Sequence, residues 1–438
     1  MKKVLLVMSA LCLLTGLSFA QVTSIATGNW NEGVNWSTGA VPKATDDVVI
    51  AAGNTITMDA DNGVCKNLTV DGTLTFPDAA SRKLTVNGNT TVNATGKFNT
   101  FSTGSPASLR EHIITLKGDL TVLAGGNFDM RRGSNPNVAL GTVVFDGTTT
   151  SNITLSQTAY GSSIEEFNSV TINKTGGARV ILKAGNLYMS NNSSTGPTIL
   201  TMTSGIVEVQ GTSIWGYLAT SSTNMKDFSN ASYFIGNLGR GMSNSSEALR
   251  VFPVGDSKGY RPVTVKSKAT TNATGHMVIV NCIPGNANNN SKLATGIDKV
   301  SGVRYYQVSY TKGTTGATSL DLDTLGVSYG ADDGVKAGNT NLRVALSTDN
   351  RANWSGLSQD ILPHTTVIAS DPTTIIADVL ATPVKLNDGA SIYLGLARKT
   401  GTTENTLIPT TDVERISSVP SEFNITQNYP NPFNPSTE

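Results

Sequence analysis

The side chains that most often carry chemistry are sparse in this chain. Its three histidines, His112, His276 and His364, stand alone, and the sequence contains no HExxH or CxxC motif that would gather metal ligands. It also lacks the G-x-S-x-G turn that presents a nucleophilic serine. The sequence therefore predicts no catalytic residue, no cofactor and no metal site. Each histidine is interpreted as an ordinary strand or turn residue.

Two acidic stretches resemble calcium loops only in part. The segment DADNG, residues 59–63, has a glycine where a further oxygen ligand is needed and lacks a distal glutamate, which favours a simple turn. A second stretch, DLDTLGVSYGADDG, carries Asp321, Asp323, Asp332 and Asp333. These carboxylates are predicted to be solvated loop residues, with a weak structural cation site as the alternative.

The elements that would position any site are short and β-like. From Val48 to Val209 the chain repeats triplets of the kind apolar-Thr-apolar, as in Leu68-Thr69-Val70, separated by Gly and Asn. This period of two places one face of each strand inward, and Gly and Asn suit tight turns. Strands this short bury a core only by stacking, so we expect a parallel solenoid, with a β-sandwich as the competing architecture.

The overall composition limits the partners. The net charge is +0, and 15% of the residues are charged, against about 25% in ordinary soluble domains. A neutral chain lacks the positive surface that nucleic acid requires. The sequence contains no basic amphipathic helix of the kind that binds a membrane surface. The sequence therefore excludes nucleic acid as the expected partner.

A group of residues ahead of the first triplet is predicted to cap the solenoid, because an open first coil would expose apolar surface and unpaired strand edges. These residues are Trp30, Trp36, Pro42 and Asp46. A sugar-stacking role for the two tryptophans is the alternative.

The segment GNWNEGVNWSTGAVPKATDDVVI resembles the opening of a β-helical module found on secreted bacterial surface proteins, and later segments such as GTVVFDGTTTSNITL resemble its further coils. From about residue 230, RYYQVSY and FPVGDSKGYRPVTV resemble a β-sandwich that follows such solenoids. The resemblance implies an all-β fold: a right-handed parallel β-helix or solenoid, then an antiparallel β-sandwich-like region. The expected divisions are a cap at 21–50, a solenoid at 51–225 and the sandwich at 226–399.

Enzymes built on parallel β-helices line one face with acidic and basic residues. Here the outward triplet position is mostly threonine, and the charged pairs Arg131-Arg132 and Glu165-Glu166 are adjacent residues that point to opposite faces of a strand. No catalytic face is visible. The segment STDNRANW, residues 347–354, resembles the Asp-box hairpin with Arg351 in place of glycine, which implies a structural role for Asp349 and Trp354.

The two ends of the chain carry the clearest targeting signals. Residues 1–20 combine two lysines, an apolar run and small residues, which is typical of a signal peptide cleaved between Ala20 and Gln21. We expect no transmembrane segment after its removal. The remaining cysteines, Cys65 and Cys282, are more simply explained as buried thiols than as a disulfide, although pairing stays open.

A polar linker is expected at 400–419. Residues 420–438 then resemble the start of the C-terminal sorting domain of type IX secretion substrates, of the Bacteroidetes–Ignavibacteria group. This resemblance rests on Tyr429, Pro430, Asn431, Pro432, Phe433, Asn434 and Pro435. It implies the type IX machinery as a partner and the medium or outer surface of a Gram-negative bacterium as the location. The domain looks truncated, and the full reading frame is expected to continue into further strands.

These features predict a structural or adhesin-like surface protein without catalytic activity. Its expected ligands are extracellular glycans or neighbouring surface proteins, bound through many weak hydrogen bonds. The alternatives are a carbohydrate-active enzyme or a carbohydrate-binding module built on a β-helix, and a passive spacer in a larger chain.

Overall fold

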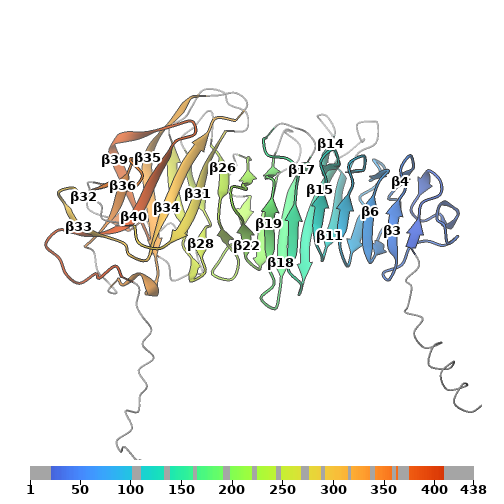
Figure 1. The fold of residues 1–438 in the computed structure, drawn as a ribbon, viewed down its shortest axis with the longest axis horizontal. Helices are drawn as coiled ribbons and strands as arrows, with labels where there is room; N and C mark the ends of the chain where they lie inside the picture. The colour runs from blue at the N-terminus through green and yellow to red at the C-terminus, as the bar shows by residue number, and fades with distance from the viewer. Residues whose placement is uncertain are drawn as a thin grey trace, which may run out of the picture.

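The computed structural model describes residues 21–100, 110–132, 139–160, 165–190, 198–219, 224–242, 248–267, 276–287, 292–313, 317–335, 341–357, 362–363 and 374–408. Their regular structure is almost entirely β-strand, with 3-10 turns at η2 (Gly33–Asn35) and η3 (Ala331–Asp333). Figure 1 shows an elongated rod with a broader C-terminal part. The predicted fold class is confirmed: a parallel β-solenoid of about seven turns precedes antiparallel sheets. Ala20 and the predicted sorting motif at 429–435 lie outside the described residues.

The solenoid is built from three parallel sheets, to which successive coils contribute one strand each. The first sheet contains β1 (Gln21–Thr23), β3 (Asp47–Ile50), β6 (Asn67–Val70), β9 (Thr90–Val92), β12 (Leu120–Val122), β16 (Ser151–Thr154), β19 (Val180–Ala184), β22 (Val207–Val209) and β25 (Phe234–Ile235). The second contains β2 (Gly28–Asn29), β4 (Thr55–Thr57), β7 (Thr73–Thr75), β10 (Lys97–Asn99), β13 (Asn127–Asp129), β17 (Glu165–Phe167), β20 (Leu187–Met189), β23 (Trp215–Tyr217) and β26 (Leu238–Gly241).

The third sheet lies between the other two along the path of each coil. It contains β5 (Gly63–Cys65), β8 (Lys83–Val86), β11 (Arg110–Leu116), β15 (Ala139–Gly147), β18 (Ser169–Lys174), β21 (Leu200–Ser204) and β24 (Met225–Lys226), and β14 (Arg131–Arg132) pairs with β15. Parallel pairing thus runs from β1 at residue 21 to β26 at residue 241. It extends beyond both ends of the expected solenoid, residues 51–225.

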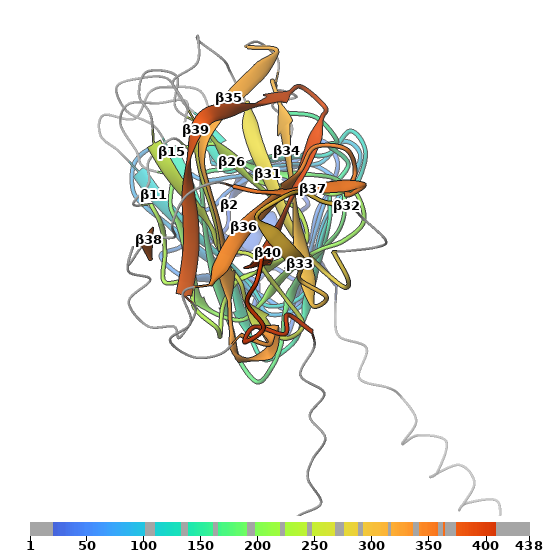
Figure 2. The same ribbon diagram turned by 90° about the vertical axis from the view of Figure 1, so that its left-hand side faces the viewer.

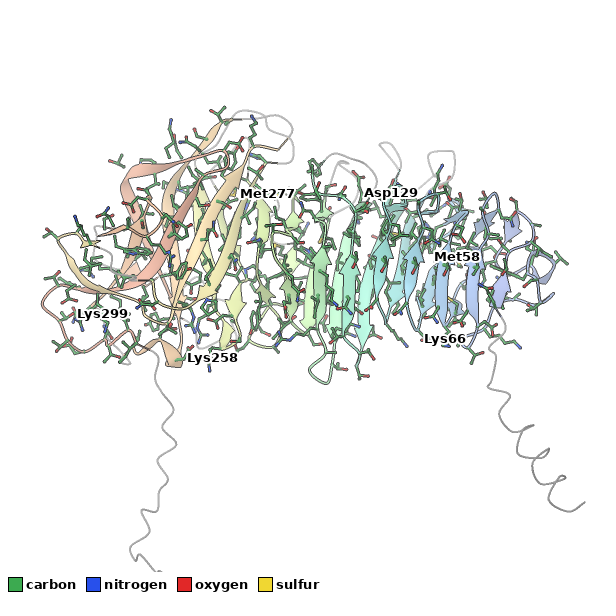
Figure 3. The ribbon with its side chains drawn as sticks, in the orientation of Figure 1. Met58, Lys66, Asp129, Lys258, Met277 and Lys299 are labelled. Atoms are coloured by element: carbon green, nitrogen blue, oxygen red, sulfur yellow. The ribbon has the colours of Figure 1, made fainter. Side chains whose placement is uncertain are left out.

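The triplets explain why the coils stack. In β6, Leu68 and Val70 are buried while Thr69 between them faces outward. The same outward threonine recurs in register along the first sheet, at Thr69, Thr91, Thr121 and Thr154. Strand period two therefore separates a continuous apolar core from a hydroxyl-bearing surface. Figure 3 shows the side chains along the rod, with Lys66 projecting from its surface.

A row of phenylalanines packs along the interior beside the second sheet. The ring centroids of Phe98 and Phe128 lie 5.4 Å apart, and those of Phe128 and Phe167 lie 5.1 Å apart. Phe76 extends the row at 6.2 Å from Phe98. All four rings are buried. Each ring contacts its counterpart in the next coil, so this row couples neighbouring coils.

A ladder of amide and carboxylate side chains connects the coils at the start of the first sheet. The Asn67 side-chain amide donates to Asp47 Oδ1 at 2.7 Å, and Asn67 Oδ1 accepts from the Asn89 backbone amide at 2.7 Å. Asn89 Oδ1 accepts from the Asp119 backbone amide at 3.0 Å. Asp119 Oδ1 in turn accepts from Asn152 N and Nδ2, at 2.7 and 3.0 Å. The ladder satisfies backbone amides that the short strands leave unpaired.

Replacing Asp119 with alanine is expected to lower the free energy of unfolding by about 2 kcal/mol, because two hydrogen bonds to a carboxylate are lost. Urea-induced unfolding measures this change. Asp321, an exposed aspartate of the C-terminal region, supplies the control, since Asp321→Ala should change stability by less than about 0.5 kcal/mol. Equal effects of the two substitutions would show that the ladder does not stabilise the solenoid.

The residues predicted to cap the solenoid lie at its first coil. Trp30 and Trp36 pack edge to face, with ring centroids 5.1 Å apart, and each is 1% exposed. The Trp36 indole N–H donates to the Trp30 carbonyl at 2.8 Å. Pro42 is buried and Asp46 is half-buried, with Asp46 Oδ2 accepting from the Lys43 amide. Because both indoles are buried, neither offers a ring face for stacking a sugar.

The second sheet continues without a break into the C-terminal region. β26 pairs antiparallel with β31 (Met277–Pro284), and the sheet runs on through β34 (Arg304–Thr311), β40 (Ser391–Lys399), β36 (Leu342–Ser347), β37 (Asn353–Gly356) and β32 (Lys292–Leu293), with β33 (Ile297–Val300) also on β40. An antiparallel sheet lies beside it, formed by β27 (Ala248–Phe252), β30 (Val263–Ser267), β35 (Ser319–Tyr329), β39 (Thr374–Asn387) and β38 (Leu362–Pro363). A small hairpin joins β28 (Gly255–Asp256) to β29 (Gly259–Tyr260).

Figure 2 looks toward this end of the rod and shows the sandwich strands in front of the solenoid. Buried side chains from both regions belong to one continuous apolar core. The described part of the expected linker, residues 400–408, returns to the sandwich. There Leu407 is fully buried and its amide donates to the Gly334 carbonyl.

Cys65 and Cys282 are free and buried, which confirms the prediction of buried thiols. Burial raises the pKa of Cys65 to about 12.

Candidate functional site

A groove crosses the outer face of the third sheet. It has a volume of about 310 Å³, at the lower end of the range of ligand pockets. It spans β11, β15, β18, β21 and β24, and β11, β15 and β18 can be followed along the rod in Figure 1. Its lining residues are Glu111, Ile113, Leu140, Thr142, Asn168, Ser169, Thr171, Ile199, Thr201 and Lys226.

The strand register arranges these side chains in two rows. Thr171 of β18 lies opposite Thr201 of β21, which lies opposite Lys226 of β24. Two residues back along the strands, Ile113 of β11 lies opposite Thr142 of β15. Neighbouring strands are about 4.8 Å apart and alternate residues about 7 Å apart, so the groove presents a regular lattice of side chains.

The rim of the groove is held by a small hydrogen-bond cluster. The Asn168 side-chain amide donates to Ser169 Oγ at 3.0 Å, and the Ile199 backbone amide donates to the same oxygen at 3.1 Å. Both Asn168 and Ser169 are buried. These contacts fix the start of β18 against the start of β21 and keep this wall of the groove in place.

Opposite charges stand at the two ends of the groove. Glu111 at the start of β11 and Lys226 at the end of β24 are both exposed. They are separated by four strand spacings, about 19 Å, which is too far for an ion pair. Among the described residues that line the groove, Glu111 is the one carboxylate. Glycoside hydrolysis needs two carboxyl groups about 5 to 10 Å apart, and the described lining does not supply such a pair.

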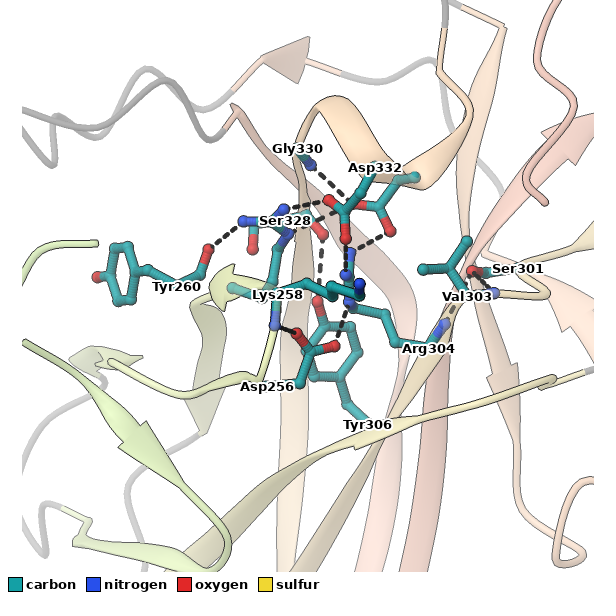
Figure 4. Close-up of polar contacts among 12 residues, drawn as sticks. Asp256, Lys258, Tyr260, Ser301, Val303, Arg304, Tyr306, Ser328, Gly330 and Asp332 are labelled. Atoms are coloured by element: carbon teal, nitrogen blue, oxygen red, sulfur yellow. Dashed lines mark hydrogen bonds and ion pairs between the residues drawn. The ribbon is translucent and has the colours of Figure 1, made fainter. Parts of the chain in front are cut away.

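A second polar cluster connects the solenoid end to the sandwich. Figure 4 shows Arg304 of β34 between Asp256 of the β28–β29 hairpin and Asp332 of η3. Arg304 Nε lies 2.8 Å from Asp256 Oδ2, and Arg304 also pairs with Asp333. Arg261 pairs with Asp332 and, at 3.4 Å, with Asp333. Arg304, Asp256 and Asp333 are each at most 2% exposed.

The electrostatics of this cluster follow from burial and close opposite charges. Burial alone would lower the pKa of Arg304, but the carboxylates of Asp333 and Asp256 outweigh it and raise that pKa well above its usual range. Burial raises the pKa of Asp333 despite its contact with Arg304. Burial also opposes ionisation of Asp332, yet hydrogen bonds from Arg304 and Arg261 lower its pKa. Ion pairs in this cluster therefore link three chain segments: residues 256–261, β34 and η3.

The acidic stretch at 321–333 thus divides in a way that its sequence did not predict. Asp332 and Asp333 belong to the buried cluster instead of being solvated, because two arginines distant in sequence reach them. Asp323 pairs with Lys266 at 3.1 Å, and Asp321 is exposed. In the described part of the chain, no group of three or more His, Cys, Asp or Glu side chains could hold a metal ion.

The other charged residues that the sequence singled out form contacts within the fold. In the turn at 59–63, Asp59 Oδ1 accepts from the Asn31 amide at 2.9 Å and Asp61 pairs with Arg82. The adjacent glutamates of β17 separate as expected, with Glu165 buried and Glu166 half-buried. Glu165 accepts from the amides of residues 156 and 157. The side chains of Arg131 and Arg132 lie outside the described residues.

The Asp-box-like hairpin forms despite its missing glycine. Asp349 Oδ1 accepts from Ser347 Oγ at 2.8 Å and from the Asn353 amide at 3.0 Å, and the bonds from Asn353 and Ser347 lower the pKa of Asp349 to about 2. Arg351 adopts the left-handed φ of 68° that glycine usually provides. Its guanidinium lies 4.4 Å from the centre of the Tyr305 ring. Trp354 is buried. The hydrogen bonds to Asp349 stabilise the turn between β36 and β37.

His112 is a buried neutral residue of the solenoid core. Its Nδ1 accepts from the Arg82 backbone amide at 3.1 Å, and its ring lies 4.8 Å from Phe76. Burial, assisted by the charges of Arg110 and Arg82, lowers its pKa to about 4. His276 is also buried and contacts the Met242 carbonyl at 2.7 Å, whereas His364 lies outside the described residues.

This burial makes stability depend on pH. Between pH 6.5 and 4, His112 is protonated in the unfolded chain but stays neutral in the folded chain. The contribution is complete above pH 6.5 and falls as the pH drops toward 4, by on the order of 3 kcal/mol. His112→Asn keeps an acceptor for the Arg82 amide but does not titrate. Urea unfolding across this range should therefore show a shallower pH dependence for the variant, and parallel curves would contradict the assignment.

One protein family is similar to part of the solenoid. Residues 35–154 match the G8 domain, a stretch that begins in the cap and ends in β16. No curated protein and no solved structure matches the chain. No helix within the described residues is long and apolar enough to cross a membrane. A β-helical fold with a stretch similar to the G8 domain, which is typical of extracellular proteins, is consistent with a structural or surface protein.

Proposed function

We propose that this protein is a secreted or cell-surface rod whose role is structural and adhesive, without catalytic activity. The observation that carries the proposal is the groove on the third sheet, where hydroxyls and two separated charges face outward from a rigid solenoid. Uninterrupted pairing from β26 into β31 and the buried arginine–aspartate cluster support a single stiff body. Such a body holds a binding face away from the surface that carries it.

Adhesion can be tested with beads coated with the full chain. They should be retained on polysaccharide-coated surfaces and released by soluble saccharide of the same kind. Beads coated with the full chain after heat denaturation provide the control for non-specific attachment. Equal retention of native and denatured coatings would contradict an adhesive role.

The export route is proposed from the two ends of the sequence. The N-terminal segment resembles a signal peptide cleaved before Gln21, and Tyr429–Pro435 resembles the type IX sorting motif. In a type IX-competent Gram-negative host, the product of the complete gene should reach the surface or medium. It should accumulate in the periplasm when the translocon is deleted. Unchanged surface exposure in the deletion strain would contradict this route.

A carbohydrate-binding module is the second candidate, and the hydroxyl-lined groove favours it. It differs from the adhesive proposal in the partner chemistry it requires: an adhesin can also contact neighbouring surface proteins. Competition with soluble saccharide distinguishes the two candidate functions. Retention on protein-coated surfaces that soluble saccharide does not reduce would favour a protein partner.

A further inference from the structure

We infer that the groove on the third sheet binds an oligosaccharide that carries carboxylate groups, with a carboxylate at Lys226 and sugar hydroxyls along the threonines. The inference rests on the proposed adhesive function and names the ligand and its orientation. The groove lies on the outer face of the third sheet, and all of the lining residues used here are described by the structure.

The first support is a set of uncommitted hydroxyls. Thr142, Thr171 and Thr201 form no side-chain hydrogen bond with other described residues. Each hydroxyl has one donor and two acceptor positions. Thr171 and Thr201 lie directly opposite each other on neighbouring strands, so their hydroxyls repeat at about 4.8 Å. A ligand with many closely spaced hydroxyls satisfies such an array.

The second support is the placement of charge. Lys226 continues the row of Thr171 and Thr201, and no ion pair with another described residue engages its ammonium. A ligand carboxylate beside it would form a charge-assisted hydrogen bond, which is stronger than a neutral one. At the other end, the exposed Glu111 carboxylate is an acceptor and suits sugar hydroxyls. The two ends therefore give the ligand a direction.

The third support is the floor of the groove. Ile113, Leu140 and Ile199 contribute apolar surface between the polar groups. The C–H faces of a sugar ring can lie against such surface while its hydroxyls reach the threonines. With one positive and one negative end, the groove lacks the positive surface that a nucleic acid backbone requires. The combination of apolar floor, hydroxyl rows and one ammonium favours an acidic saccharide.

The test uses the full chain and two probes, an oligogalacturonate hexamer and neutral maltohexaose, with binding measured by titration calorimetry. The wild type should bind the acidic probe more tightly, and added salt should weaken that preference. Lys226→Gln should reduce affinity for the acidic probe about tenfold, because a hydrogen bond to a charged group is lost, and leave the neutral probe unchanged. Lys183→Gln changes an exposed lysine of β19 in the first sheet and should have no effect.

The hydroxyl rows are tested by the double variant Thr171→Val, Thr201→Val. It should weaken binding of both probes about fivefold to tenfold, since each lost hydrogen bond contributes modestly. Thr91→Val with Thr121→Val makes the matched change on the first sheet, where these threonines are also in register. Equal effects of the two double variants, or of the two lysine variants, would overturn the groove assignment while the adhesive function stands. Absence of saccharide binding by the wild type, with beads still retained on protein surfaces, would overturn the inference alone.

Discussion

Replacing Arg304 with methionine is expected to lower the free energy of unfolding by about 3–5 kcal/mol. The substitution removes the guanidinium that pairs with Asp256, Asp332 and Asp333 and leaves those carboxylates without it. The shape of the side chain is largely kept, so the loss reports electrostatics more than packing. Urea unfolding should reveal the change as a lower midpoint.

Two further variants isolate the cause. Lys312 pairs with Asp388 at 3.6 Å where both side chains are at least 33% exposed, so Lys312→Met should cost at most about 1 kcal/mol. Adding Asp256→Asn, Asp332→Asn and Asp333→Asn to Arg304→Met should recover part of the lost stability, because uncompensated buried charge is removed. A further loss on adding the three asparagines would contradict the role assigned to the cluster.

Replacing Phe128 with alanine is expected to cost about 3–5 kcal/mol, because a fully buried ring between Phe98 and Phe167 is lost. In a solenoid each coil depends on its neighbours, so the damage should spread to the adjacent coils. Hydrogen exchange should show faster exchange in β10, β13 and β17 and little change in β1 and β3.

The matched control is Leu123, an apolar residue of the turn between β12 and β13 that is 45% exposed. Leu123→Ala should change stability by about 0.5 kcal/mol or less. If Phe128→Ala were as mild as this control, the phenylalanine row would not be a main connection between coils.

The solenoid could be predicted because its information is local. Triplets such as Leu68-Thr69-Val70 specify which side chains point inward, and Gly and Asn between them specify turns. The row of aligned threonines follows from repeating that pattern in register. The prediction needed no knowledge of distant contacts.

The two polar clusters could not be predicted in the same way. The groove collects side chains from five strands in different coils, and the register between coils depends on turn lengths that differ from one coil to the next. In the buried cluster, Asp256 and Asp332 are brought to Arg304 by separate segments. Arg261 lies within FPVGDSKGYRPVTV, whose resemblance to a β-sandwich gives no sign of an ion pair. Buried charge of this kind becomes visible when the tertiary partners are known.

The central claim is that this rod binds saccharide without cleaving it. The most direct measurement incubates the full chain with the oligogalacturonate hexamer and determines both the bound fraction and the chain length of the saccharide in the same sample. The account predicts saturable binding and hexamer of unchanged length after prolonged incubation. Shortened products would contradict it by showing catalysis, and no binding by the folded chain would contradict the claim that the rod binds this saccharide.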